Sequence, residues 1–175
     1  MKVVMARRNL AGAPRFAAPE GFTVRPWRAG DEEAWLDIHR EADPLNSFGP
    51  DTFGKQFGRD AATLAARQFY LCDARGAAVG TATAWFGEEA WLGWGRVHWV
   101  ALRPAFQGRG LSKPLLSATL RRLAELGHDK AYLTTDTLRR PAIGLYLAFG
   151  FSPVARNEEE RGAWLALGID PGGAA

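Results

Sequence analysis

The chain has 175 residues, of which 47% are hydrophobic and 23% charged, and its formal net charge is +3. This length and balance predict one globular domain, and no apolar run approaches the roughly 18 residues that a membrane span needs. The basic residues are scattered and their longest blocks are pairs, so we expect neither a nucleic-acid binder nor a membrane protein.

The opening residues and the cysteine count bear on the cellular compartment. Arginines stand where a secretory signal would carry its apolar block. Cys72 is the only cysteine, so no internal disulfide can form, which is typical of a reducing cytoplasm. A lone thiol can act as a nucleophile, but the sequence around Cys72 reads as a strand running into a turn and favours a buried thiol. We therefore expect a cytoplasmic protein.

The first third of the chain predicts an arm, a strand, a helix and a long irregular segment. Residues 1–20 are rich in Ala, Arg, Pro and Gly without clear periodicity, and a loose arm is expected there. Residues 22–27 alternate like a strand, and Pro26 favours its edge or end. Residues 29–42 predict a helix, because acidic residues load its positive end and apolar residues recur at helical spacing. Residues 43–60 indicate either a long loop or a short broken helix, and a functional flap is one usual reason for such length.

The middle of the chain predicts strands followed by a helix. Residues 67–86 read as a hairpin of two strands, and residues 93–104 read as a further strand. Residues 112–126 carry their leucines as one stripe, which predicts an amphipathic helix that stops at Gly127.

The last third returns to a strand, a helix and a strand. Residues 130–137 predict a strand, residues 141–151 a helix that starts with proline and ends at glycine, and residues 163–167 a last strand. The order of elements predicts a mixed α/β domain over residues 21–168, with a short tail at residues 169–175.

The stretch FQGRGLSK, residues 106–113, lies between a predicted strand and the amphipathic helix. It lacks the third glycine of a dinucleotide fingerprint and the pattern of a nucleotide P-loop. Its glycines let the backbone fold close around an anion, so the N–H groups of residues 108–113 could converge on a pyrophosphate, helped by the helix dipole and by Arg109 or Lys113. Taken alone, the pattern also fits a tight loop without a ligand.

Two stretches at matching spacing carry a resemblance to a known family. Residues 99–116, WVALRPAFQGRGLSKPLL, combine a strand, a proline, Gln-x-x-Gly-x-Ser and a helix, and residues 142–151 read AIGLYLAFGF. They resemble the cofactor motif and the second signature of the GNAT superfamily of N-acetyltransferases, with Ser112 where Gly or Ala is usual. The resemblance implies a GNAT-like α/β fold: a central, mostly antiparallel twisted sheet, splayed at the cofactor strand, with helices on both faces. It also implies acetyl-CoA as co-substrate and no metal.

The resemblance implies that the turn binds the pyrophosphate of acetyl-CoA. It also implies that the pantetheine arm pairs with the backbone of the preceding strand, as an added strand would. Arg139 departs from the family, because an Asn usually stands there and Arg offers no acceptor for the same contact. Arg139 is assigned to a cofactor phosphate instead, with a solvated surface pair as the alternative. The residues implied for the cofactor are Val100, Ala101, Leu102, Gln107, Gly108, Arg109, Gly110, Leu111, Ser112, Lys113 and Arg139.

Two side chains are implied for catalysis. Tyr146 stands at the family position from which a phenol protonates the departing thiolate, although a buried aromatic would fit the same place. Strand alternation puts His98 on the same side as Val100 and Leu102, and a strand His at this place resembles the proton conduit of serotonin-acetylating members. A core histidine fits His98 equally well.

Other groups are weaker candidates for the chemistry. Asp136, Glu88 and Glu89 could act as a base or bind an ammonium group, although the glutamates also fit a solvated turn. The backbone N–H of Val100 or Leu102 is a candidate donor to the oxyanion.

These assignments predict an N-acetyltransferase that moves an acetyl group from acetyl-CoA to a primary amine by direct attack in a ternary complex. Residues 43–60, with Trp85, Trp91 and Trp94, are expected to form the acceptor pocket. The acceptor could be a small-molecule amine, a protein N-terminus or a lysine, and the general base, the acyl length and the oligomeric state stay open, a homodimer included. The rival is a non-catalytic module that senses acyl-CoA, which the departure at Arg139 keeps open.

Overall fold

A computed structural model describes residues 1–172 of the chain. Contacts group the chain into two compact units. The central unit comprises Arg15–Trp85 and Val97–Arg122, and the terminal unit comprises Met1–Pro14, Phe86–Arg96 and the residues from Leu123 onward.

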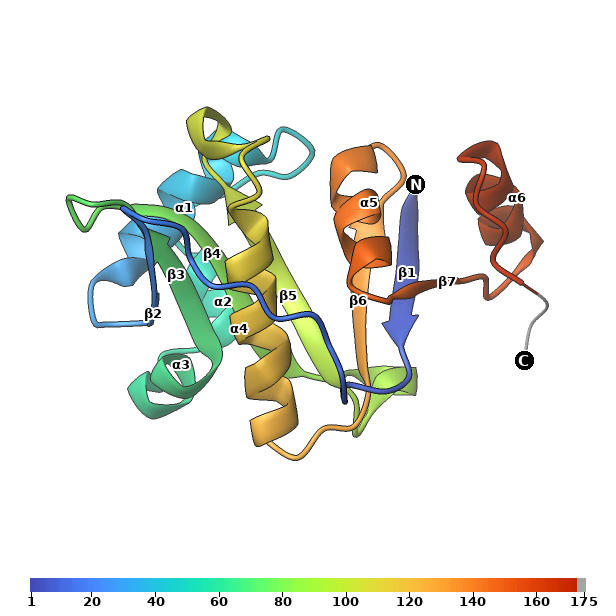
Figure 1. Ribbon diagram of the computed structural model, residues 1–175, viewed down its shortest axis with the longest axis horizontal. Coiled ribbons are helices and arrows are strands. Elements are labelled where there is room, and N and C mark those ends of the chain that lie inside the picture. The colour runs from blue at the N-terminus through green and yellow to red at the C-terminus, as the bar shows by residue number, and fades with distance from the viewer. Residues whose placement is uncertain (173–175) are drawn as a thin grey trace. The chain divides into compact units, whose positions relative to one another are not determined.

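Seven strands form the sheet of the described chain, in the order β2-β3-β4-β5-β6-β1-β7 (Figure 1). The strands are β1 Lys2–Arg7, β2 Thr23–Pro26, β3 Gln68–Cys72, β4 Ala78–Phe86, β5 Gly95–Leu102, β6 Ala131–Asp136 and β7 Ser152–Val154. The helices are α1 Asp31–Ala42, α2 Thr52–Phe57, α3 Ala61–Arg67, α4 Ser112–Glu125, α5 Arg140–Ala148 and α6 Glu158–Ala166, with 3-10 turns η1 Glu89–Trp91 and η2 Pro104–Phe106. The β5–β6 ladder is parallel, and the ladders β1–β6, β1–β7, β2–β3 and β3–β4 are antiparallel. The expected mixed α/β class with a mostly antiparallel sheet is confirmed.

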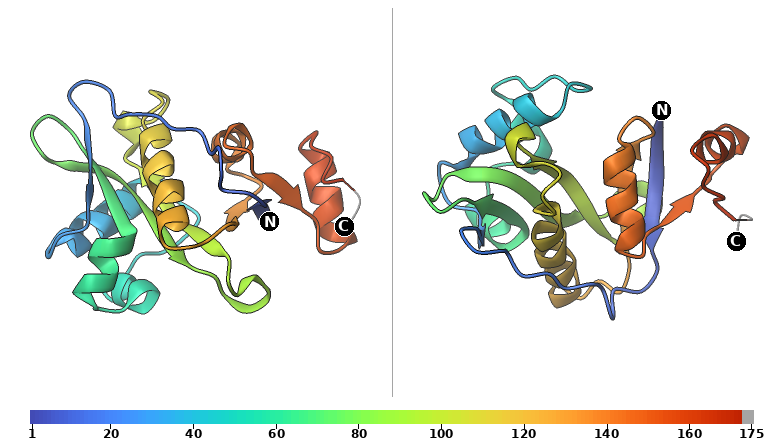
Figure 2. Two further views of the ribbon diagram at one scale, coloured as in Figure 1. Left: turned by 60° about the horizontal axis from the view of Figure 1, so that its bottom comes forward. Right: turned by 45° about the horizontal axis from the view of Figure 1, so that its top comes forward.

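In the central unit, helices cover both faces of the strands (Figure 2). Successive residues of β3 enter opposite cores, as the period of two along a strand requires: Tyr70 and Cys72 point into one, Phe69 and Leu71 into the other. The α1 core contains Trp27, Trp35, Leu36, Ile38, Phe53, Phe57, Leu64, Tyr70, Cys72, Trp85 and Ala101. The α4 core contains Phe69, Leu71, Val79, Ala82, Leu102, Leu111, Leu115 and Ala118. The burial expected for Cys72 is thus confirmed.

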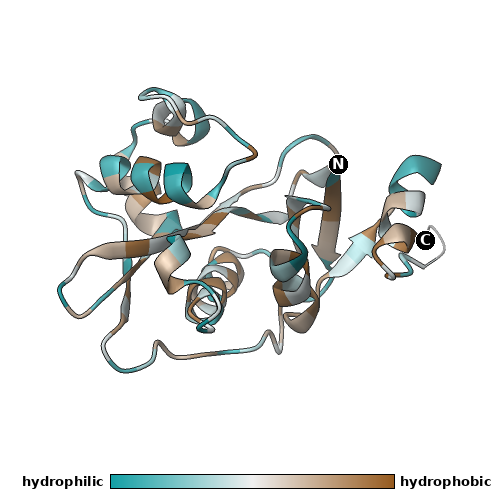
Figure 3. Ribbon diagram, turned by 90° about the horizontal axis from the view of Figure 1, so that it is seen from above, coloured by the Kyte–Doolittle hydropathy of each residue, from teal (hydrophilic) through white to brown (hydrophobic). Residues whose placement is uncertain are grey.

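The expectation of a loose arm over residues 1–20 is wrong for its first part. Residues 2–7 form β1, which pairs with β6 on one side and β7 on the other, and the apolar strand that begins at the N-terminus is visible in Figure 3. Its apolar run, residues 3–6, is buried throughout. A strand buried on both faces shows no alternation, so periodicity could not reveal it. The folded domain therefore cannot begin at residue 21 as expected.

The last strand expected at residues 163–167 is also wrong, because α6 occupies Glu158–Ala166. The side chain of Asn157 accepts the N–H of Glu160 at 2.9 Å and caps the helix, and three glutamates fill its first turn. Trp164 is fully buried and fixes the inner face of α6. Of the tail expected at residues 169–175, residues 173–175 lie outside the described residues.

None of the helices within residues 1–172 has the length and apolar character that crossing a membrane requires.

Candidate functional site

The turn between β5 and α4 has the backbone shape expected from its glycines. Gly108 and Gly110 have φ values of 71° and 74°, in the left-handed region that glycine adopts without strain. The side-chain amide of Gln107 donates to the carbonyl of Leu102 at 2.9 Å, which ties the turn back to the end of β5. Leu111 is buried in the α4 core and anchors the other end. The chain is thus held at both sides of an exposed loop.

One of the amides expected to face an anion is already in use. The N–H of Lys113 donates to the carbonyl of Gly110 at 3.0 Å, so it closes the first turn of α4 instead of pointing outward. The amide of Lys113 is therefore not available to an anion, and the amides of residues 108–112 remain the candidates. These lie at the N-terminus of a 14-residue helix, where the positive end of the dipole favours an anion.

Both basic side chains of the turn lie over aromatic rings. The guanidinium of Arg109 is 5.3 Å from the ring centre of Phe22 and 5.7 Å from that of Phe106. The ammonium of Lys113 is 5.1 Å from the ring centre of Phe16. Both cations belong to exposed residues, so they add positive charge to the surface around the helix N-terminus.

In the sheet β5 lies between β4 and β6, and its ladder to β6 pairs Gly95 with Ala131 and Arg96 with Tyr132. The central unit contains Val97–Leu102 of β5 but not β6, so within this unit β5 is an edge strand beside β4. The two strands approach closely at Gly80, where a Cβ would lie 2.3 Å from Leu102 Cδ2 and 3.0 Å from the carbonyl oxygen of Ala101. The N–H of Arg103 continues this pairing to the carbonyl of Val79 at 2.8 Å. An edge strand presents backbone groups that an extended amide-bearing ligand can pair with.

The alternation assumed along β5 is broken at Trp99, which has a φ of 50°. The ring of His98 contacts Phe57 of the α1 core at 5.7 Å between centroids, and Ala101 belongs to that core as well. Val100 and Leu102 pack instead with the α4 core. The expectation that His98 shares a side with Val100 and Leu102 is therefore wrong, because the unusual backbone at Trp99 shifts the pattern by one residue.

His98 is 9% exposed, and its ring contacts that of Phe57 in α2 of the central unit. Its ring contacts that of Trp99 at 5.6 Å, and the indole N–H of Trp99 donates to Gln56 Oε1 on α2 at 2.9 Å. Nothing in the linear sequence signals the Gln56–Trp99 pair, because it joins residues of two elements that are far apart along the chain.

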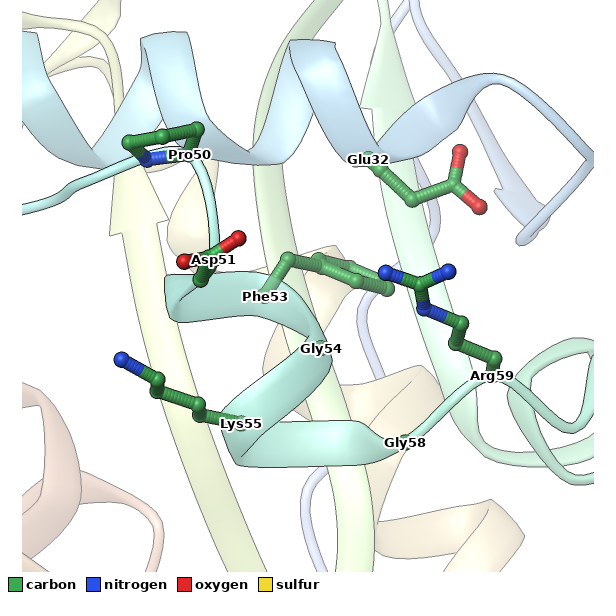
Figure 4. A pocket seen from close by; sticks show the side chains of 8 residues that line it. All are labelled: Glu32, Pro50, Asp51, Phe53, Gly54, Lys55, Gly58 and Arg59. Carbon is green, nitrogen blue, oxygen red and sulfur yellow. The ribbon is translucent and has the colours of Figure 1, made fainter.

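A surface pocket of about 570 Å³ lies beside α2 (Figure 4). Figure 4 shows the side chains of Glu32 and Arg59 pointing toward one another across it. Its lining residues are Glu32, Pro50, Asp51, Phe53, Gly54, Lys55, Gly58 and Arg59. Most come from the segment 43–60 that was expected to form the acceptor pocket, and their mixed charges could bind a ligand with both amine and anionic groups.

Trp91 and Trp94, also expected at the acceptor pocket, pack within the terminal unit. Trp91 stacks on Tyr132 at 4.9 Å between ring centres and meets Trp94 edge-on at the same distance. The ammonium of Lys130 lies 5.3 Å from the Trp94 ring. These contacts give both indoles a packing role in the terminal unit.

In the terminal unit, Tyr146 lies on α5 and is buried, with its ring 6.0 Å from that of Phe151. Burial raises the pKa of Tyr146 to about 12, and the positive charge of Arg139 partly opposes this rise. Arg139 is the residue that precedes the first turn of α5. The phenol therefore stays protonated at neutral pH, which any role as a donor requires.

Two of the other candidate acids and bases, Glu88 and Asp136, contact neighbouring groups. Glu88 forms an ion pair with Arg96 at 2.6 Å. Asp136 accepts the N–H of Leu138 at 3.0 Å. Over the described residues, no group of three or more His, Cys, Asp or Glu side chains comes together as a metal site.

The geometry defines an α/β protein whose edge strand leads through a glycine turn into a helix N-terminus suited to an anion. Residues 31–151 match the model of the Acetyltransferase (GNAT) family, and the chain therefore belongs to this family.

Curated relatives and solved structures agree with this assignment. A mycothiol acetyltransferase of Nocardioides sp. is 33% identical in a match covering 85% of this chain and 56% of the relative, and one of Pseudarthrobacter chlorophenolicus is 34% identical over 87% and 48%. The chain thus spans about half the length of the curated relatives it matches. A GCN5-related N-acetyltransferase from Sphaerobacter thermophilus has a TM-score of 0.69 and 26% identity over 87% of this chain and 48% of that structure.

Proposed function

We propose that the protein transfers an acetyl group from acetyl-CoA to a primary amine. The observation that carries the proposal is that three features follow one another along the chain. They are the edge strand β5 of the central unit, the left-handed glycines of the next turn, and two cations at the N-terminus of α4. Each part suits a different portion of CoA: backbone amides suit the pantetheine arm, and the turn suits the pyrophosphate.

Apart from Arg139, the groups proposed to hold the cofactor belong to the central unit. The backbone of Val100, Ala101 and Leu102 would pair with the pantetheine amides, because these residues form the end of the edge strand. The amides of residues 108–112, with Arg109 and Lys113, would hold the pyrophosphate. Gln107 would act indirectly, since its side chain holds the carbonyl of Leu102. Arg139 is proposed to reach a phosphate.

The acetyl thioester supplies an electrophilic carbonyl and a thiol as leaving group. Tyr146 is proposed to donate a hydrogen bond to the departing sulfur. Because the pKa of Tyr146 is about 12, full transfer of its proton to a thiolate of pKa ~8.5 would be uphill by roughly 4–5 kcal/mol. Donation of the hydrogen bond, helped by the charge of Arg139, is therefore the role that the phenol can fill.

The amine must lose a proton before it can attack. An α-amine with a pKa near ~7.8 needs only about 1 kcal/mol to be neutral at pH 7, whereas a lysine needs roughly 4–5 kcal/mol. His98 is proposed to carry the proton away. Its support is that it faces the α1 and α2 side of β5, where the segment 43–60 lies, while the α4 side holds the cofactor turn.

The acceptor of mycothiol acetyltransferases is the first candidate acceptor for this chain, because the curated relatives carry that name. The pocket beside α2 is proposed to bind part of the acceptor. Its carboxylates, Glu32 and Asp51, suit an ammonium group, and Lys55 and Arg59 suit an anion or hydroxyl groups.

Two measurements test the proposal in sequence. Calorimetry with CoA should show saturable one-to-one binding, and absence of binding would contradict the proposal. Thiol release from acetyl-CoA, measured with a panel of amines that includes the mycothiol acetyltransferase acceptor, should then depend on the amine. Binding of CoA without amine-dependent release would favour the non-catalytic acyl-CoA sensor instead.

A further inference from the structure

The segment Arg15–Phe22 runs across α4 on its way from β1 to β2 (Figure 1). The N–H of Phe16 donates to Ser117 Oγ on α4 at 2.9 Å. Ala18 and Phe22 pack against the α4 core. Although sequence composition predicted a loose arm here, the structure holds this segment, named the strap, against the helix that begins at the cofactor turn.

The strap supplies the aromatic faces on which the two cations of the turn lie. Phe16 lies under the ammonium of Lys113 at 5.1 Å, and Phe22 lies under the guanidinium of Arg109 at 5.3 Å. Phe106, which precedes the turn, meets Phe22 edge-on at 6.1 Å and extends the surface beneath Arg109. Both cations are therefore held by the same segment.

An aromatic partner leaves a cation able to bind an anion. A carboxylate would neutralise the charge of Lys113 or Arg109, whereas a ring attracts the cation through its quadrupole and leaves the positive charge in place. The side chains of Lys and Arg lose several rotamers when they bind a phosphate, so holding them beforehand reduces the entropy cost of binding. Phe16 is 43% exposed, so its ring lies at the surface, where the ammonium of Lys113 meets it at 5.1 Å.

We infer that Phe16 and Phe22 are positioning residues for the nucleotide end of CoA: the strap holds Lys113 and Arg109 at the cofactor turn, ready to contact phosphate oxygens. The inference rests on the proposed binding of CoA and extends it to a segment outside the region that matches the family. The ligand chemistry it specifies is a phosphorylated nucleotide, so a CoA fragment without phosphates gains nothing from the strap.

Phe16 offers the sharper test, because it is exposed and a substitution there should leave the fold intact. Phe16→Leu keeps apolar area but removes the aromatic face, and Phe16→Tyr keeps that face. Calorimetry should show that Phe16→Leu weakens CoA binding by about two- to fivefold, while Phe16→Tyr binds like the wild type. Pantetheine, which has no phosphate, should bind equally to all three proteins.

A second background separates positioning from a direct contact. In a Lys113→Gln protein, the further change Phe16→Leu should have no effect on CoA binding, because the cation that the ring positions is gone. A matching cycle with Phe22→Leu and Arg109→Gln tests the other pair. Retention of the Phe16→Leu effect in Lys113→Gln, or an equal loss of pantetheine binding, would overturn the inference.

Two further outcomes decide between this inference and the proposed function. If wild-type protein binds CoA and Phe16→Leu binds it equally well, the inference is wrong and the proposed function stands. If the wild-type protein fails to bind CoA at all, the proposed function is wrong, and the role given to the strap falls with it.

Discussion

The indole N–H of Trp99 donates to Gln56 Oε1 at 2.9 Å and joins β5 to α2 within the central unit. Trp99 has a φ of 50°, a conformation that costs a bulky residue about 1–3 kcal/mol. The indole also meets the rings of Trp35, His39 and Phe48 at 5.3 to 5.6 Å. Hydrogen bonding and aromatic packing thus offset the strain at Trp99, which lies in β5 directly before the residues proposed to bind pantetheine.

Trp99→Phe should loosen α2 while leaving the cofactor site intact. Phenylalanine has the same backbone demands as tryptophan but cannot donate to Gln56, so we expect the free energy of unfolding to fall by about 1 kcal/mol. We also expect KM for the amine to rise and the Kd for CoA to stay unchanged, as steady-state kinetics and calorimetry would show. Gln56→Leu should act similarly, and the double variant should be little worse than either. A weakened affinity for CoA in Trp99→Phe would contradict the assignment of the amine to the α2 side of β5 and of the cofactor turn to the α4 side.

His98→Gln tests the proposed proton carrier. Glutamine keeps much of the size and hydrogen-bonding capacity of histidine but does not titrate. The rate of acetyl transfer should fall, on the order of 100-fold, and mainly at acidic to neutral pH, where the amine carries its proton. His128→Gln is the matched control, because His128 lies in the terminal unit and has no proposed role in acetyl transfer. An unchanged pH–rate profile in His98→Gln would return His98 to a packing role.

The elements that the sequence predicts well are those whose signals are local. The stripe of leucines in α4 and the glycines at 108 and 110 determine the helix, the turn and their boundary without help from distant residues. The helix α5 follows from a proline at its start and a glycine after its end. α4 and the turn carry most of the residues proposed to bind the cofactor, and their local signals explain why these elements were predictable.

The elements that the sequence mispredicts depend on partners far along the chain. β1 is identified by β6 and β7, which lie more than a hundred positions away in the register of its ladders. The side on which His98 lies depends on the φ of Trp99, which packing by α1 and α2 imposes. The strap is ordered by Ser117 and the α4 core, not by its own composition. None of these has a local signal.

Gly110→Ala should weaken CoA binding through the backbone of the turn. Gly110 has a φ of 74° with open space around it, so a methyl group meets strain but no protein atom within 4 Å. Gly76 in the β3–β4 hairpin has a φ of 80° with similarly open surroundings and serves as the matched control. Both alanine variants should lose about 1 kcal/mol in the free energy of unfolding. Only Gly110→Ala should also weaken CoA in calorimetry, and equal CoA affinity in the two variants would argue against phosphate binding at the turn.

Tyr146→Phe removes the phenol hydroxyl with little change to the packing against Phe151. If the hydroxyl donates to the departing sulfur, kcat should fall on the order of 100-fold while the Kd for CoA stays constant. Arg139→Asn should lower kcat less, because it removes the charge that opposes the raised pKa of Tyr146 but leaves the donor. Full turnover in Tyr146→Phe would assign Tyr146 to the core of the terminal unit.

Tyr146 should also make the protein sensitive to alkali. Burial raises its pKa from about 10 in the unfolded chain to about 12 in the folded protein. Below pH 10 both states are protonated and the group has no effect; between pH 10 and 12 the unfolded state loses its proton first, so the free energy of unfolding falls as pH rises. The wild type should therefore lose up to about 3 kcal/mol more than Tyr146→Phe over this range. Urea unfolding at stepped pH measures the difference, and any contribution from other tyrosines is common to both proteins. Parallel pH dependences would show that the phenol is not desolvated in the folded state.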